Sequence, residues 1–121
     1  MNKIILLGKL IKDPELKIVE GTEKSFTKFI IAVERGFKTA AGERQSDLIP
    51  VTIWGRKAEV ACKYLKKGSL ISLSGRLRTG SYEDQLGNKR YLSQVVAEDF
   101  RFVNNRRVDY LKDPNNSESI V

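Results

Sequence analysis

The chain has 121 residues and a mass of 13.7 kDa, the size of a single domain with one hydrophobic core. Hydrophobic residues make up 40% of it and charged residues 31%, which is typical of a folded globular protein and not of a disordered one. With 22 Lys and Arg against 15 Asp and Glu, the net charge is +7. An excess of this size indicates a polyanionic partner, either nucleic acid or an anionic membrane surface.

The composition argues against several kinds of site. There is no histidine, so the most common general base and metal ligand are missing. The one cysteine, Cys62, has no partner for an internal disulfide and no histidine with which to build a conventional zinc site. Apolar runs such as Ile4 to Leu7 are too short to cross a bilayer or to form a signal-peptide core. We therefore expect a non-enzymatic cytoplasmic protein with no cofactor, no bound metal and no membrane partner.

The first half of the chain predicts three strands. Residues 2–11 are rich in Ile and Leu and favour a first strand with a bulge or bend at Gly8. Asp13-Pro14 interrupts this strand, and residues 16–20 are able to resume it. Residues 26–33 alternate as a second strand, and residues 48–54 favour a third. Between them, residues 34–47 are polar and predict a loop, or a hairpin extension too polar to lie in a core.

One helix follows the third strand. Residues 58, 61, 62 and 65 are apolar at i, i+3, i+4 and i+7, the spacing that places them on one helix face. Lys66 and Lys67 fit its last turn, and Gly68 fits the position just past its end. The helix therefore lies between the third strand and the remaining two.

The second half of the chain predicts two more strands. Residues 69–78 alternate, with their apolar members inward and Arg76 and Arg78 outward: Ile71, Leu73, Gly75 and Leu77 are expected to face the core. Residues 79–90 are polar, with glycines at 80 and 87, and predict a loop. A final strand covers about residues 91–103.

This order of elements predicts an all-β fold. Five strands left as an open sheet would expose edges prone to pairing, so closure into a small barrel is expected. A five-stranded barrel with a helix between its third and fourth strands is the oligonucleotide-binding (OB) architecture. We expect this domain to span residues 1–103. Residues 104–121 are poorer in apolar residues, their charges cancel, and they are expected to form a short polar tail.

The functional signal is the proximity of aromatic residues to cations in segments expected to be exposed. Phe37 lies beside Arg35 and Lys38, Trp54 precedes Arg56, and Tyr82 lies between basic pairs at residues 76 and 78 and at residues 89 and 90. Aromatic faces stack unpaired bases at about 1–3 kcal/mol each, while Lys and Arg neutralise phosphates. Neither contact requires a particular base, so the pattern predicts sequence-tolerant binding of single strands.

Each of these residues has an alternative interpretation. Trp54 fits a core position, and Arg76 and Arg78 fit the solvated face of a strand. The other aromatic residues of the strands and helix are expected to pack inside: Phe26, Phe29, Tyr64, Tyr91, Phe100 and Phe102. No catalytic constellation is evident, because Ser72 and Ser74 lack a histidine base and the adjacent acidic pairs in strands point to opposite faces.

Several runs of residues resemble the bacterial single-stranded DNA-binding proteins of the SSB type. These are Asn2 to Leu10 followed by Asp13-Pro14-Glu15, then Ala58 to Ala61 continuing through residues 64–69, and Gly75 to Thr79 followed by Tyr82, Gly87 and Arg90-Tyr91. The resemblance extends over about residues 1–103 without large gaps. It implies an OB-fold protomer that assembles into a homotetramer and binds single-stranded DNA by base stacking and phosphate contacts.

The resemblance also assigns residues. The family's stacking aromatics fall on Phe37, Trp54 and Tyr82, whereas a fourth falls on Leu48; Pro50 and Gly80 stand where relatives can carry a basic residue. Taken with the cations near the aromatic residues, the expected phosphate contacts are Lys3, Lys9, Arg35, Lys38, Arg56, Lys67, Arg76, Arg78, Lys89 and Arg90.

The C-terminal segment departs from the resemblance. Members of the main replicative type continue through a linker to an acidic tip that recruits repair and replication proteins, whereas this chain ends with residues 115–121, NNSESIV. We therefore expect that this protein does not recruit repair or replication proteins through an acidic tail. The same ending is expected of a short accessory member of the family and of a truncated one.

The expected function is binding and protection of single-stranded DNA in replication, recombination, repair or DNA uptake, in the cytoplasm and at the nucleoid. An OB-fold single-stranded RNA binder and a primosome-type protein-interaction module are the alternatives.

Overall fold

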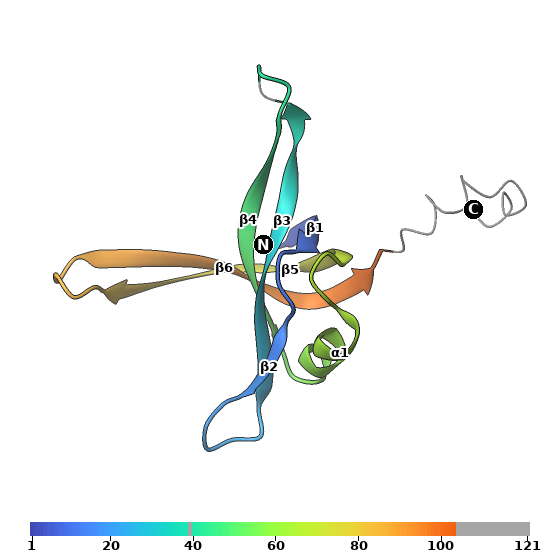
Figure 1. Ribbon diagram of the computed structural model, residues 1–121. Coiled ribbons are helices and arrows are strands. Elements are labelled where there is room, and N and C mark those ends of the chain that lie inside the picture. Colours follow the sequence, from blue (N-terminus) through green and yellow to red (C-terminus); the bar gives the residue numbers. More distant parts are fainter. Residues whose placement is uncertain (39, 104–121) are drawn as a thin grey trace, which may run out of the picture.

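A computed structural model describes residues 1–38 and 40–103, apart from the side chains of residues 37 and 38 (Figure 1). The expected C-terminal tail, residues 104–121, lies outside the described residues. The elements follow in the order β1 (Ile4–Leu10), β2 (Glu15–Ile18), β3 (Ser25–Lys38), β4 (Arg44–Trp54), α1 (Arg56–Tyr64), β5 (Leu70–Glu83) and β6 (Lys89–Phe102). No helix in the described part of the chain is long and apolar enough to cross a membrane.

Five of the strands close into a barrel, which confirms the all-β OB-fold prediction. Their order is β1-β5-β6-β4-β3, and β1 returns to pair with β3 through Lys9 and Leu10. All neighbours are antiparallel except β4 and β6, which run parallel over Val51–Ile53 and Val95–Ala97. The short β2 is added to the outer edge of β3. Residues 1–38 and 40–103 thus form six strands where five were expected, because β2 is a separate strand instead of a resumption of the first one.

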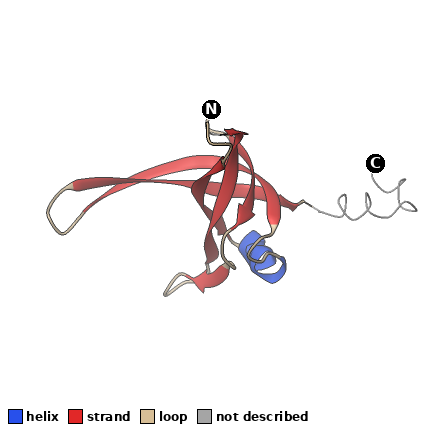
Figure 2. Cartoon of the chain, turned by 45° about the horizontal axis from the view of Figure 1, so that its top comes forward, coloured by secondary structure: helices blue, strands red, loops and turns tan. Residues whose placement is uncertain are grey.

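The core lies inside the barrel and under the helix, which packs at one end of it (Figure 2). Alternate residues of the five barrel strands supply the core, and the largest fully buried side chains are Leu10, Thr27, Ile31, Val51, Ile53 and Ile71. From α1, Ala58 and Ala61 are buried, as expected from their spacing. The helix ends earlier than predicted: Leu65 is already extended, so Lys66 and Lys67 follow the last turn instead of belonging to it.

Two segments expected as loops are mostly strand. β3 and β4 pair as far as Lys38 and Arg44, and β5 and β6 pair as far as Glu83 and Lys89, so two hairpins project from the barrel in different directions (Figure 1). The hairpin extension allowed for residues 34–47 is therefore observed. The loop expected over residues 79–90 is wrong, because only the turn from Asp84 to Asn88 lies between the strands. We call the second hairpin, residues 76–96, the β5–β6 arm.

The glycines mark where strands approach each other closely. No bulge occurs at Gly8, because residues 4–9 pair with β5 in continuous register; a Cβ there would lie 2.9 Å from the Ala32 carbonyl oxygen. The register shift lies instead between Ser74 and Gly75. Beyond it the arm leaves the barrel, so Leu77 is exposed and its expected place in the core is wrong.

Candidate nucleic-acid interface

Trp54 forms an exposed aromatic platform where β4 ends. Gly55 follows with a φ of 75°, a left-handed conformation that favours glycine, and turns the chain into α1. The register partner of Trp54 on β3 is Phe26; their ring centroids are 4.9 Å apart, with an interplanar angle of 35°. Trp54 remains 41% exposed, so Phe26 supports the indole without enclosing it. The alternative interpretation, in which Trp54 occupies a core position, is therefore wrong.

Tyr82 forms a second platform, far out on the β5–β6 arm. It is 50% exposed and its register partner is Arg90. Arg90 Nε donates to Asp84 Oδ2 at 2.9 Å. The backbone N–H of Asn88, the Arg90 guanidinium and the N–H of Leu86 together hold the pKa of Asp84 below its ordinary value. Asp84 therefore stabilises the turn of the arm and fixes the arginine beside the ring.

A continuous outer face of the barrel joins the two platforms. Residues directly opposite each other in antiparallel strands point to the same side of the sheet. Lys17 pairs with Phe26, Lys28 with Thr52, Gln94 with Arg78 and Val96 with Arg76. The Thr52 hydroxyl donates to Gln94 Oε1 at 2.6 Å and so links β4 to β6 across this face. We call the four basic residues of the face, Lys17, Lys28, Arg76 and Arg78, the cationic track.

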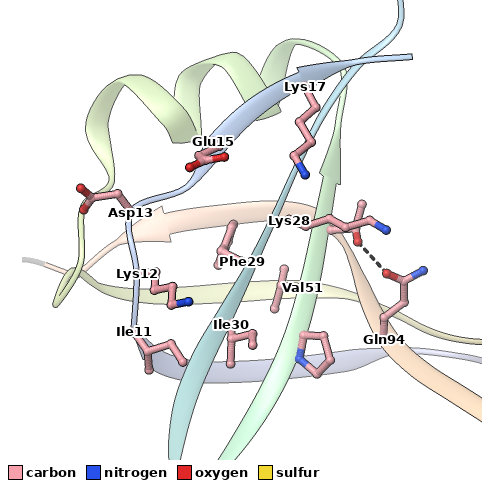
Figure 3. Close-up of a pocket in the computed structure, with 12 residues that line it drawn as sticks. Ile11, Lys12, Asp13, Glu15, Lys17, Lys28, Phe29, Ile30, Val51 and Gln94 are labelled. Carbon is pink, nitrogen blue, oxygen red and sulfur yellow. Dashed lines mark hydrogen bonds between the residues drawn. The ribbon is translucent and has the colours of Figure 1, made fainter. Parts of the chain in front are cut away.

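The face is hollowed beside the track. A groove of about 350 Å³ is lined by Lys12, Lys17 and Lys28, by the carboxylates of Asp13 and Glu15, and by apolar residues that include Ile30 and Pro50. Figure 3 shows Lys17, Lys28 and Gln94 around this groove. Lysine ammonium groups and apolar side chains in one groove suit a nucleotide, whose phosphate is charged and whose base has flat apolar faces. The groove therefore offers room for part of a single strand between the platforms.

Ion pairing divides the basic residues into two groups. On the hairpins, Arg35 pairs with Asp47 at 2.8 Å, and Arg44 pairs with Glu34 at 3.1 Å. Among the described residues, the four members of the cationic track have no carboxylate within ion-pair distance, and neither do Lys3, Lys9, Arg56 and Lys67. Glu15 is the register partner of Lys28 but forms no ion pair with it. A phosphate approaching the track therefore meets cations that no ion pair engages, whereas at Arg35 it competes with an existing partner.

The expected phosphate contacts do not all lie together. Arg56 adjoins Trp54 in a hollow of about 580 Å³. Lys3 lines a hollow with Leu48 and Leu77. Lys9 lines another hollow between β1 and β3, Lys67 follows the helix, and Lys89 lies 5.6 Å from the ring centroid of Tyr91. The side chains of Phe37 and Lys38 lie outside the described residues, so their roles stay predictions.

Four residues of this face were not identified from the sequence: Lys17, Lys28, Gln94 and Phe26, of which Phe26 was assigned to packing. The alternation of residues 26–33 placed Phe26 and Lys28 on the same side, but only the pairing with β4 and β2 shows that this side faces outward. The packing expectation holds for Phe29, which is buried, and is wrong for Tyr64, Tyr91 and Phe102, which are exposed. Across residues 1–38 and 40–103, no three acidic or cysteine side chains gather in a group able to hold a metal ion.

An OB barrel with exposed aromatic platforms and uncompensated cations on one face defines a nucleic-acid-binding class of protein. The comparisons name the family: the model of the single-strand binding protein family matches residues 1–103, and this chain belongs to that family. Proteins of this family bind and do not catalyse, which confirms that the chain is not an enzyme.

Relatives are found among the clostridia and streptococci. The single-stranded DNA-binding protein of Clostridium tetani is 46% identical over 103 residues, covering 85% of this chain and 70% of the relative. Single-stranded DNA-binding protein 1 of Clostridium acetobutylicum is 42% identical over 107 residues, covering 88% and 97%. Single-stranded DNA-binding protein 1 of Streptococcus pyogenes is 38% identical over 120 residues, covering 99% and 90%.

Proposed function

We propose that this protein binds and protects single-stranded DNA with little dependence on base sequence. The observation that carries the proposal is the outer face of the barrel, where two exposed aromatic platforms are joined by the cationic track. Exposed rings stack only on bases that are unpaired and free to leave a duplex stack, and the track neutralises the phosphates between them. The names of the relatives support DNA as the strand that is bound.

The roles of individual residues follow from this proposal. Trp54 and Tyr82 stack bases, Phe26 supports Trp54, and the cationic track contacts phosphates with help from Arg56 beside Trp54. The remaining basic residues expected from the sequence contact the strand where it continues beyond this face. One OB fold accommodates roughly 4–16 nucleotides in this mode.

The test uses the one tryptophan of the chain as its reporter. Titration with a thymidine oligomer of about 15 nucleotides, near the upper limit for one OB fold, should quench the Trp54 fluorescence, because the stacked base is in direct contact with the indole. Duplex DNA of the same length should bind more weakly. Tighter binding of the duplex would overturn the proposal, and tighter binding of a matched RNA oligomer would replace DNA with RNA as the target.

A matched pair of tyrosines tests the platforms. Tyr82→Ala should weaken binding of the oligomer by about 1–3 kcal/mol, measured by anisotropy of a labelled strand. Tyr64→Ala is the control, because Tyr64 is also exposed but lies on α1. Equal effects of the two substitutions would show that the arm is not a base platform.

We further propose self-association into a homotetramer through β1. Ile5 and Leu7 are 74% and 54% exposed on this strand, and such apolar exposure favours a protein partner. Among the described residues, β1 pairs with β3 only through Lys9 and Leu10, so the edge at residues 4–8 is open for a further strand. Sedimentation should show a tetramer that Leu7→Lys dissociates; a monomeric wild-type chain would contradict this proposal.

The cellular setting is proposed from the same binding mode. A sequence-tolerant binder protects any exposed single strand, which fits replication, recombination, repair or DNA uptake in the cytoplasm and at the nucleoid. Microscopy of a fluorescently tagged chain should show it concentrating on DNA when single strands accumulate. A distribution that ignores such damage would contradict this setting.

A further inference from the structure

The β5–β6 arm has a second face, on the side away from the cationic track. The arm projects clear of the barrel, and residues 76–83 and 89–93 are all exposed (Figure 1). Successive residues of a strand point to opposite faces of a sheet. Tyr82 and its register partner Arg90 lie on the face of the cationic track, so Tyr91 and its partner Ser81 lie on the other one. We call this other side of the arm the far face.

Tyr91 presents an aromatic ring on the far face. It is 75% exposed, against 50% for Tyr82. Lys89 Nζ lies 5.6 Å from the centroid of the Tyr91 ring. Glu83 is the register partner of Lys89, yet the two form no ion pair. An exposed ring beside an unpaired ammonium group suits a base and its phosphate, so Tyr91 repeats on the far face the combination that Tyr82 and Arg90 form on the first one.

The far face leads back to a fixed segment at the base of the arm. Leu77 and Ser93 line a hollow of about 680 Å³ that also contains Lys3. The Asn2 side chain donates from Nδ2 to the Leu77 carbonyl at 2.7 Å, and its Oδ1 accepts from the Leu77 N–H at 2.9 Å. These two bonds extend the attachment of β1 to β5 beyond the pair of Ile4 with Gly75. Asn2 therefore holds Lys3 at the point where the far face meets the barrel.

The edge of the arm is a short step for a single strand. Tyr91 directly follows Arg90, the partner of Tyr82, and the two strands of a ribbon lie only about 4.7–4.9 Å apart. A strand that stacks on Tyr82 therefore reaches Tyr91 by turning round the edge of the arm, without crossing the barrel. Single strands lack the stiffness that resists such a turn in a duplex.

We infer that the far face of the arm is a further part of the single-strand site, where Tyr91 stacks a base and Lys3 contacts a phosphate. Asn2 is the positioning residue, since it acts by holding the segment that carries Lys3. The inference rests on the proposed binding of single-stranded DNA and extends it to strands long enough to pass round the arm. It gives Lys3 and Lys89, which lie away from the cationic track, a defined place on the path.

The experiment compares thymidine oligomers of about 8 and about 16 nucleotides, the second being the upper limit for one OB fold. The short strand is expected to occupy the face between Trp54 and Tyr82, whereas the long strand has nucleotides left for the far face. Tyr91→Ala should therefore weaken binding of the long oligomer about fivefold or more and leave the short one almost unchanged. Tyr82→Ala should weaken both. Tyr91→Phe keeps a stacking ring and should bind the long oligomer as the wild-type protein does.

Tyr64→Ala is the matched control. Tyr64 is also exposed, and Lys63 Nζ lies 5.4 Å from the centroid of its ring, but this pair belongs to α1 and not to the arm. The substitution should leave the affinity for both oligomers unchanged. Thermal unfolding followed by circular dichroism checks that each variant is folded under the binding conditions.

The salt dependence gives a second and independent readout. Lys3→Ala should reduce the magnitude of the slope of log K against log salt by about 0.7 for the long oligomer, the effect of one phosphate contact. The slope for the short oligomer should stay unchanged. Asn2→Ala should shift the long-oligomer slope in the same direction, because Lys3 is then no longer held at the far face.

The outcomes separate this inference from the proposed function. Equal weakening of both oligomers by Tyr91→Ala, or weakening of neither, would overturn the far-face site while leaving single-strand binding in place. A change in the sedimentation of the free protein without a change in affinity would identify the far face as a contact between copies of the chain, and would also overturn the inference. A wild-type protein that binds neither oligomer would instead overturn the proposed function itself.

Discussion

Trp54 illustrates how a single residue is prepared for binding before any ligand arrives. Phe26 packs against one side of the indole at a tilt of 35°, and Lys28 Nζ lies 5.9 Å from the centroid of the Phe26 ring. A supported ring loses less conformational freedom when a base stacks on it, because fewer rotamers remain to be fixed. In the proposed binding mode, the nearby ammonium group contacts a phosphate of the bound strand. Two uncharged rings and one cation therefore act together as a nucleotide-sized unit.

Two buried threonines lie on neighbouring strands, and replacing each by valine should change the free energy of unfolding in opposite directions. Thr27 is fully buried, and its hydroxyl has no hydrogen-bond partner among the described residues, whereas the Thr52 hydroxyl donates to Gln94. Thr27→Val removes an unsatisfied polar group at similar shape and should raise the free energy of unfolding by about 1 kcal/mol. Thr52→Val should lower it by about 0.5–1.5 kcal/mol, because a hydrogen bond is lost.

Chemical denaturation of the wild-type protein and the two variants measures both changes. The pair controls for the general effect of replacing a buried hydroxyl by a methyl group, since both residues lie in the same barrel wall. Destabilisation by Thr27→Val of the same size as by Thr52→Val would show that the Thr27 hydroxyl is satisfied in solution, for example by water.

At the scale of elements, the two hairpins show why polar sequence does not always mean loop. Residues 34–38 and 44–47 are too polar to lie in a core, yet they pair with each other beyond the barrel, as do residues 79–83 and 89–93. Both faces of such a hairpin are wet, so the apolar alternation that identifies half-buried strands is absent. The pairing is instead fixed by the strands that the barrel has already placed side by side. The sequence therefore predicts the exposure of both segments and allows the hairpin of residues 34–47, but it is wrong about the loop over residues 79–90.

Two glycines of β5 give a prediction about the base of the β5–β6 arm. A Cβ at Gly75 would lie 2.1 Å from the Val96 carbonyl oxygen, and backbone atoms cannot yield as a side chain can. Gly75→Ala should therefore lower the free energy of unfolding by about 1–3 kcal/mol or more. Gly80→Ala, in the same strand with nothing within 4 Å of its Cβ, should change it by less than about 0.5 kcal/mol. Equal melting temperatures for the two variants would contradict the close approach at the bulge.

The turn of the arm should depend on pH through Asp84. Its pKa is lowered in the folded protein by the Asn88 N–H and by Arg90, so its contribution to stability is complete above the ordinary aspartate value of about 3.9. The contribution is lost as the pH falls through the lowered pKa. Amide exchange at Asn88, measured relative to the intrinsic rate of an unprotected amide at the same pH, should therefore stay slow at neutral and mildly acidic pH and accelerate only below about pH 4.

Asp84→Asn is the control for this titration. Asparagine keeps an acceptor for the turn N–H groups but does not titrate in this range, so the acid-dependent acceleration should disappear. Acceleration at about pH 5–6 in the wild-type protein, well above the ordinary aspartate value, would mean that another group controls the turn.

At the scale of the whole molecule, some residues of the site are predictable from their neighbours in the sequence, whereas others join the site only because the strands of the barrel pair with one another. Trp54, Tyr82, Arg76 and Arg78 were identified because each lies near other aromatic or basic residues along the chain. Lys17 and Gln94 carry no such local signal, and Lys28 stands between Phe26 and Phe29 in a segment whose aromatic residues were expected to pack inside. They join the site through the pairing of β2 with β3, of β3 with β4 and of β6 with β5. Register between strands distant in sequence, which local patterns do not encode, decides which polar residues share a face.

The distribution of ion pairs over the whole molecule predicts how binding responds to salt. Each phosphate neutralised by a free cation releases counterions, which makes the slope of log K against log salt more negative by about 0.7 for single strands. Arg78 lies on the cationic track without an ion-pair partner among the described residues, so Arg78→Ala should reduce the magnitude of that slope by about 0.7. Arg44 is already paired with Glu34 on the other hairpin, so Arg44→Ala should change the slope much less although the net charge changes equally. Titrations with a labelled thymidine oligomer at several salt concentrations measure both slopes. Identical slopes for the two variants would mean that net charge, and not the track, attracts the strand.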